Sequence, residues 1–144
     1  MHTFRHATGA AMIALSAIVA SAFGAAAQTG NVELELNTAQ DINDGCRLTY
    51  VATNATQAGL EKVSYEVAVF DLDGLVQRLL VLEFGWLPSG KTRVVQFDLP
   101  EQTCASISRI SVNGAVECSS AQGEQTVCRD RALLSTRVRT IQFN

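Results

Sequence analysis

The sequence predicts an all-β protein, folded as a single antiparallel β-sandwich of about seven strands. Two observations carry this prediction. After residue 30, apolar and polar residues alternate over short runs, and no long segment has the spacing of an amphipathic helix. Turn sequences rich in Gly, Pro, Asn and Asp separate these runs at regular intervals, which is typical of an immunoglobulin-like sandwich.

The N-terminal residues have the composition of a signal peptide. A weakly basic start containing Arg5 precedes an apolar stretch, residues 10–23, and the small residues 25–27 form a cleavage site. The expected boundaries are therefore 1–27 for the signal peptide and 28–144 for the β-sandwich domain. The Ala-rich leader favours a bacterial origin and a periplasmic or secreted location. No second apolar run is long enough to span a membrane, so we expect no transmembrane segment in the mature chain.

The expected strands can be placed one after another along the chain. In the first strand, Val32, Leu34 and Leu36 alternate with glutamates, and turn-forming residues 41–45 lead into the second. An Asp-Gly turn at 73–74 joins two β-rich runs as a hairpin, and Pro88 begins the next turn. The expected strands are residues 32–36, 46–52, 62–70, 75–84, 93–99 and 107–112, with a last strand between 133 and 143.

The 4 cysteines, Cys46, Cys104, Cys118 and Cys128, all follow the leader. They include no closely spaced pair of the kind found in zinc sites and redox motifs, and export to an oxidising compartment favours disulfides. Alternating strand directions place the first two cysteines at one end of the sandwich and the last two at the other. A strand of eight residues is about 26 Å long, whereas a disulfide needs Cα atoms within about 7 Å. The predicted pairs are Cys46–Cys104 and Cys118–Cys128.

Two turn-containing segments resemble a known family. They are residues 69–74, Val-Phe-Asp-Leu-Asp-Gly, and residues 87–92, Leu-Pro-Ser-Gly-Lys-Thr. With the strands around them, they resemble FxLYD-type immunoglobulin-like domains of exported bacterial proteins, and also small uncharacterised secreted proteins of alphaproteobacteria. The similarity covers roughly residues 46–118. It implies an immunoglobulin-like fold and an extracytoplasmic setting, and it supplies no catalytic residues.

The composition argues against most enzyme classes. Both histidines, His2 and His6, lie in the leader, so the mature chain lacks the side chain most used for acid–base catalysis and transition-metal binding. No Gly-x-Ser-x-Gly motif occurs. Glu83 and Asp98 form a carboxylate pair that a glycoside hydrolase could use, although carboxylates on neighbouring strands often meet by chance. We therefore expect no enzymatic activity and no cofactor. The net charge of −3 also provides no footprint for nucleic acid.

Two further patterns have structural interpretations. Asp41, Asp44, Asp71 and Asp73 could offer oxygen ligands to calcium, but they lack the spacing of an EF-hand, and turns favour Asp for backbone reasons. They are expected to form turns. Residues 54–56, Asn-Ala-Thr, match the N-glycosylation sequon, which we expect to be inert in a bacterial protein.

The hairpin around residues 79–82 is the first candidate interaction surface. Leu-Leu-Val-Leu places two large apolar side chains on each face of its strand, and the partner strand is apolar on both faces too. Either a loop, such as the segment after Cys118, covers the second face, or another protein does. The candidate partner surface consists of Ala68, Phe70, Leu79 and Val81.

A C-terminal group of arginines is the second candidate surface. Arg129, Arg131, Arg137 and Arg139 could dock an anionic partner, or they could protect an edge strand from aggregation. The last two share parity with the apolar residues at 141 and 143, so a single regular strand would need a bulge there.

The function that follows is an exported, non-catalytic binding or interaction module of the bacterial periplasm or envelope. The alternative is a structural accessory subunit that self-associates, or supports an envelope assembly, through the hairpin at 79–82. The expected partner is a protein or a second copy of the chain. A hydrolase is the third and most distant hypothesis.

Overall fold

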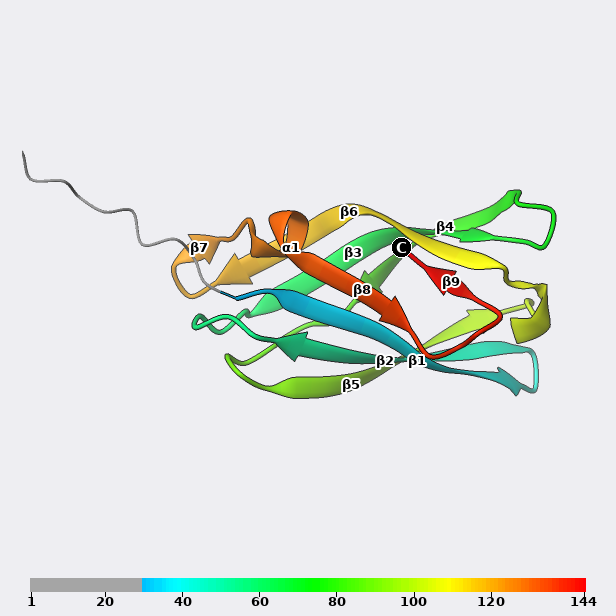
Figure 1. Ribbon diagram of the computed structural model, residues 1–144, viewed down its shortest axis with the longest axis horizontal. Helices are drawn as coiled ribbons and strands as arrows, with labels where there is room; N and C mark the ends of the chain where they lie inside the picture. Colours follow the sequence, from blue (N-terminus) through cyan, green and yellow to red (C-terminus); the bar gives the residue numbers. More distant parts are fainter. Residues whose placement is uncertain (1–29) are drawn as a thin grey trace, which may run out of the picture.

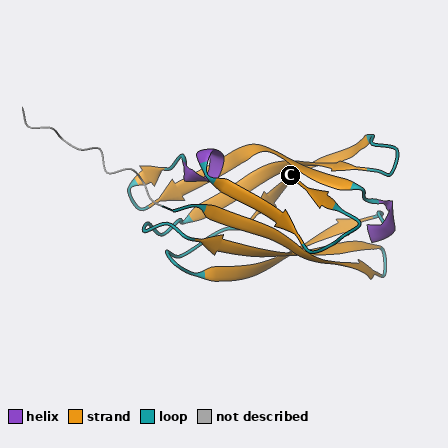
Figure 2. Ribbon diagram, viewed as in Figure 1, coloured by secondary structure: helices purple, strands orange, loops and turns teal. Residues whose placement is uncertain are grey.

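The computed structural model describes residues 30–144, and the expected signal peptide lies outside these residues. Two β-sheets lie against each other along the long axis of the molecule (Figure 1). Two short helical turns, η1 (Cys104–Ser106) and α1 (Val127–Asp130), lie near opposite ends (Figure 2). The strands are β1 (Val32–Ile42), β2 (Gly45–Asn54), β3 (Lys62–Phe70), β4 (Val76–Glu83), β5 (Thr92–Pro100), β6 (Arg109–Ser120), β7 (Gly123–Glu124), β8 (Ala132–Thr136) and β9 (Gln142–Phe143).

The strand order defines the two layers. The first sheet has the order β5-β2-β1-β8, and the second has the order β4-β3-β6-β7, with β9 also paired to β6. The two layers enclose alternate side chains of each strand. On β2, for example, Cys46, Leu48, Tyr50 and Ala52 are all buried, as their alternation in the sequence predicts.

The structure confirms the disulfide-stabilised all-β sandwich and corrects two details. It has nine strands in the described residues instead of about seven, and β1–β8 and β6–β9 are parallel pairs, so the sheets are mixed. The expected last strand is in fact two strands in different sheets. β8 pairs with β1 in the first sheet. The chain then crosses to the second sheet after Thr136 and ends in β9, which pairs with β6. Arg137 and Arg139 lie in the crossing segment, so their parity with Ile141 and Phe143 does not require a bulge.

Bulges explain why two strands are longer than their alternation predicts. The β1–β2 register shifts at Asn37, and pairing with β2 continues to Ile42. On β6, register shifts at Asn113 and Val116 interrupt the two-residue period, yet the strand runs to Ser120.

The structure contains both disulfides expected from the strand order. Cys46 faces Leu99 across the β2–β5 ladder, and Cys104 follows the end of β5. The Cα atoms of Cys46 and Cys104 are 4.9 Å apart. At the other end, the Cα atoms of Cys118 and Cys128 are 6.0 Å apart. These distances agree with the end-to-end argument made from the sequence.

An aromatic cluster joins the two sheets in the core. The rings of Tyr50, Tyr65, Phe84, Phe97 and Phe143 meet edge to face, with centroids 5.3–6.1 Å apart. The two tyrosine hydroxyls differ in their contacts. Tyr65 donates a 2.9 Å hydrogen bond to the carbonyl oxygen of Cys128, whereas the buried hydroxyl of Tyr50 has no hydrogen-bond partner among the described residues. Burial raises the pKa of both phenols well above the usual value.

These contacts predict opposite effects for two identical substitutions. Tyr50→Phe removes a buried hydroxyl that has no partner, so we expect the free energy of unfolding to rise by about 1 kcal/mol. Tyr65→Phe leaves the Cys128 carbonyl without its donor and is expected to lower that energy by about 1–2 kcal/mol. Urea unfolding with the disulfides intact measures both changes. Equal losses of stability in the two variants would contradict this interpretation.

Asn54 organises the loops at one end of the sandwich. Its side chain is fully buried, and its amide nitrogen donates to the carbonyl oxygens of Ala58 (2.8 Å) and Leu87 (2.9 Å). Its Oδ1 accepts from the backbone N–H (3.0 Å) and the hydroxyl (2.7 Å) of Thr56. The same residue that forms the sequon is therefore a structural link between the β2–β3 and β4–β5 connections.

Candidate functional site

The outer face of the second sheet, which points away from the first, carries an exposed apolar patch. Cross-strand register builds this face in four rows, each with one residue from β4, one from β3 and one from β6. The rows are Val76–Phe70–Arg109, Leu79–Ala68–Ser111, Val81–Glu66–Gly114 and Glu83–Ser64–Glu117. We call Ala68, Phe70, Val76, Leu79 and Val81 the apolar patch.

The four residues predicted for a partner surface share this face but differ in accessibility. Leu79 and Val81 are 60% and 49% exposed. Ala68 lies between them and β6 and is buried, because its short side chain is covered by its neighbours. Phe70 is half-buried, since the Arg109 guanidinium lies 3.8 Å above its ring centroid. The exposed part of the predicted surface is therefore its β4 half.

The other two residues of the hairpin run turn inward. Leu82 is buried, and Leu80 is half-buried and packs against the core. The strand is thus apolar on both faces, as its sequence indicates, with one face in the core and one in solvent.

The loop that could have covered the patch lies elsewhere. In the segment after Cys118, Val127 and Cys128 are buried in the core, and Cys128 accepts the hydrogen bond from the inward-facing Tyr65. This segment closes one end of the sandwich, and the exposure of Leu79 and Val81 shows that it does not cover them. The loop-coverage interpretation is wrong for this segment.

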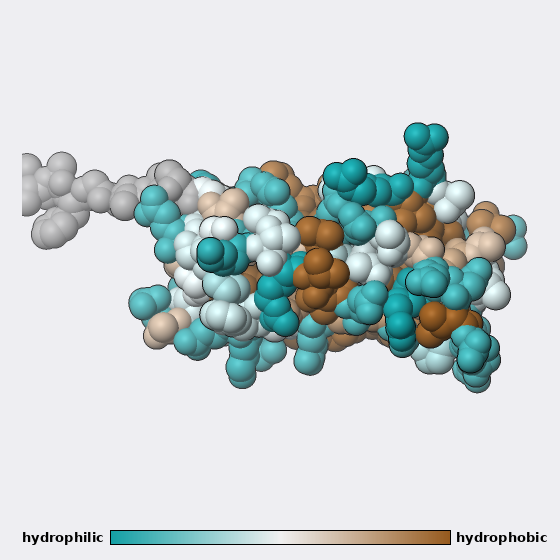
Figure 3. Space-filling view, turned by 90° about the horizontal axis from the view of Figure 1, so that it is seen from below, coloured by the Kyte–Doolittle hydropathy of each residue, from teal (hydrophilic) through white to brown (hydrophobic). Residues whose placement is uncertain are grey.

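Sequence parity alone misses Val76. Its even number would place it on the face opposite Leu79, but a register shift skips Gln77, so Val76 faces Phe70 on the outer side and is 53% exposed. Leu72 and Leu75, in the adjoining turn, are also exposed. Figure 3 shows another side of the molecule, where apolar side chains lie in separate groups among polar ones. Trp86, Val94, Val116 and Leu133 are exposed outside the patch.

The border of the patch is polar and unevenly charged. Arg109 lies in the first row, and Glu83 and Glu117 lie in the last. Within the face, Glu66 accepts a 2.8 Å hydrogen bond from the Asn113 side chain. The Lys62 ammonium is 4.0 Å from the Glu117 carboxylate.

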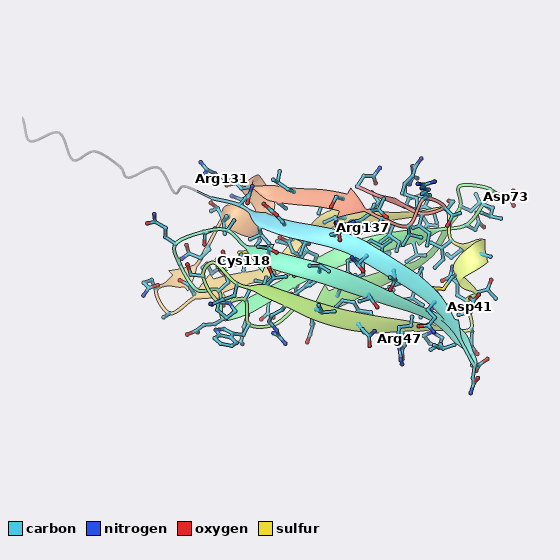
Figure 4. All side chains as sticks on the ribbon, turned by 60° about the horizontal axis from the view of Figure 1, so that its bottom comes forward. Asp41, Arg47, Asp73, Cys118, Arg131 and Arg137 are labelled. Atoms are coloured by element: carbon cyan, nitrogen blue, oxygen red, sulfur yellow. A yellow bond between two sulfur atoms is a disulfide. The ribbon has the colours of Figure 1, made fainter. Side chains whose placement is uncertain are left out.

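The C-terminal arginines do not converge on one site. Arg137 forms a 2.8 Å ion pair with Glu35, and Arg129 forms one of the same length with its neighbour Asp130. Arg131 donates to the Gly30 carbonyl oxygen, and Figure 4 shows it well separated from Arg137 along the molecule. The hydrogen bonds from Asn37 and Arg137 hold the pKa of Glu35 below its usual value, and the one from Arg129 does so for Asp130. Arg139 is exposed.

Asp44 and Asp73 lie in turns and Asp71 begins one, as predicted, whereas Asp41 is the next-to-last residue of β1. Asp71 accepts from the backbone N–H groups of Asp73 and Leu75, closing the β3–β4 turn, and Asp41 accepts from the N–H of Cys104. Asp41, on β1, and Asp73, in the β3–β4 turn, both lie at one end of the molecule (Figure 4). Within residues 30–144, no group of three or more His, Cys, Asp or Glu side chains is arranged to hold a metal ion.

The carboxylates considered for hydrolysis do not face each other. Asp98 points outward from β5 of the first sheet and forms a 2.7 Å ion pair with Arg47, whose hydrogen bond lowers the pKa of Asp98. Glu83 is exposed on β4 of the second sheet, in the last row of its outer face.

In the part of the chain that the structure describes, no helix is both long and apolar enough to cross a membrane. Comparisons with protein families, curated proteins and solved structures find no match for this chain.

Proposed function

We propose that this chain is an exported, non-catalytic interaction module of the bacterial periplasm or envelope, which binds a protein through the apolar patch. The observation that supports this most directly is the exposure of Val76, Leu79 and Val81 along β4, all on the outer face of the second sheet. Exposed apolar groups gathered on one face are uncommon in monomeric proteins and often mark interaction sites. The signal-peptide pattern and the two disulfides support a location outside the cytoplasm.

A rigid support makes this face suitable for docking. The patch spans two paired strands whose inner side chains are in the core, so its shape is fixed before a partner arrives. A preformed surface loses little conformational entropy on binding, and binding energy is concentrated in a few central apolar residues.

The test replaces Leu79 and Val81 by threonine, which keeps β propensity while removing apolar surface. We expect the double variant to keep its far-UV circular dichroism and both disulfides, and to lose most of its hydrophobic-dye fluorescence and any association seen in the unaltered protein. Val94→Thr with Leu133→Thr is the matched control, because these side chains are exposed to a similar degree on the first sheet. Unfolding of the Leu79/Val81 variant, or equal dye loss in the control, would count against the patch.

A further inference from the structure

The outer face of the second sheet is electrically asymmetric along its strands. Its first row ends in Arg109, its two middle rows hold the exposed Leu79 and Val81, and its last row contains Glu83 and Glu117. Arg109 lies at one end of an apolar centre, and two carboxylates lie at the other, where the exposed Lys62 ammonium is 4.0 Å from Glu117 and offsets part of their charge.

Arg109 has no carboxylate within ion-pair distance among the described residues. Its guanidinium is held in place by stacking on Phe70, 3.8 Å from the ring centroid, and its buried Nε has no hydrogen-bond partner in the described part of the chain. The stacked guanidinium is therefore a positioned cation that can accept an anionic group on the same face.

We propose that the apolar patch binds a second copy of this chain, face to face, about a two-fold axis that runs across the strands between the Ala68 and Glu66 rows. This inference rests on the proposed function and names its partner. Rotation about this axis places the first row of one copy over the last row of the other. Each strand lies over the same strand of the other copy, β4 over β4, β3 over β3 and β6 over β6. Leu79 of one copy then meets Val81 of the other, and Arg109 approaches Glu117 of the other, twice by symmetry.

Complementarity of charge selects this occupant. In a two-fold interface each contact is made twice, so one face must carry both halves of every ion pair, as this face does. In the two rows beside the axis, the negatively charged side chain is Glu66. The rotation places Glu66 of one copy opposite Ala68 of the other, so the two Glu66 carboxylates do not face each other directly.

The size of the face sets the expected strength. Three strands about 4.8 Å apart and four rows about 7 Å apart give a contact of roughly 400 Å² per copy, below the roughly 800 Å² of a standard interface. The dimer is therefore expected to be weak and concentration-dependent, with a dissociation constant in the micromolar range or above.

Charge exchange tests the proposed contact in the oxidised, exported protein. Arg109→Glu and Glu117→Arg should each raise the dimer dissociation constant by about tenfold or more in analytical ultracentrifugation.

An equimolar mixture of the two variants should form a heterodimer. In it, the glutamate introduced into one copy faces the arginine introduced into the other, and the two unaltered side chains face each other in the second contact. The combined variant should also recover association. Arg139→Glu changes the charge equally at an exposed position outside the face and should leave the dimer unchanged.

Several results would overturn the inference. One is a wild-type protein that remains monomeric at millimolar concentration; another is a pair of single variants that fail to associate when mixed, although circular dichroism shows both to be folded. If Arg109→Glu does not fold, Arg109→Gln removes the charge alone and should still weaken the dimer. A monomeric protein whose dye binding depends on Leu79 and Val81 would leave the proposed function standing with a different partner. Dimerisation that survives Leu79→Thr/Val81→Thr would overturn both.

Discussion

Replacing Asn54 by aspartate is expected to destabilise the fold by at least about 3 kcal/mol, although the two side chains have nearly the same shape. The substitution removes the two Asn54 N–H groups that donate to the Ala58 and Leu87 carbonyl oxygens and puts a buried carboxylate beside these carbonyl dipoles. Because Asn54 is fully buried, water cannot compensate for either loss. A protonated aspartate would have one O–H donor in place of the two N–H groups of Asn54, so at least one of these two hydrogen bonds would still be lost.

Thermal unfolding measures this effect, and we expect the midpoint to fall by more than about 10 °C. Asn43→Asp is the matched control, since Asn43 is exposed in the β1–β2 turn and should tolerate the change. Similar midpoints for the two variants would show that the Asn54 hydrogen bonds do not hold these loops together.

Removing the Cys46–Cys104 disulfide by paired alanine substitutions is expected to cost about 4 kcal/mol, and removing Cys118–Cys128 about 3 kcal/mol. The costs differ because the two loops differ in length: the first bond joins cysteines 58 positions apart, and the second joins cysteines 10 positions apart. A domain of this size is stable by about 5–15 kcal/mol, so losing the first bond should remove between about a quarter and most of that stability.

The second bond has a role that the sequence alone does not predict. From the sequence, removing this bond is expected mainly to loosen a polar loop. In the structure, however, Cys128 is buried, and its carbonyl oxygen accepts the hydrogen bond from Tyr65. We therefore expect faster amide hydrogen exchange in α1 and also near Tyr65 on β3, in a protein that remains folded. Exchange that increases only in residues 119–126 would contradict the link to the core. A larger loss of stability from the second pair than from the first would contradict the loop-length argument.

Single-residue alternation is enough to predict the inward faces of β2, β3 and β5. In these strands each core position, such as Leu48, Val67 or Leu99, is two residues from the next. Alternation fails at bulges, because an unpaired residue changes the parity of everything that follows. Because Asn113 and Val116 are unpaired, the second half of β6 does not alternate with a two-residue period, and the sequence pattern does not predict it.

The candidate site is predictable only in part for the same reason. Leu79 and Val81 stand out in the sequence because a sandwich strand normally has one polar face. Val76 joins them through the shift at Gln77, and Arg109 through its position beside Phe70 on another strand. Cross-strand neighbours depend on register, which the sequence of a single strand does not contain.

The parallel pairing of β1 with β8 determines how the domain responds to force. The chain enters β1 at Val32 and leaves β8 at Thr136, and these residues lie at opposite ends of the same pair. Once the two residues of β9 detach, tension between the chain ends acts along both strands. The force then acts in shear on all five paired positions of β1 and β8 at once. It does not separate these pairs one after another. The order of the terminal strands thus builds resistance to stretching into a domain that is otherwise held together by its core.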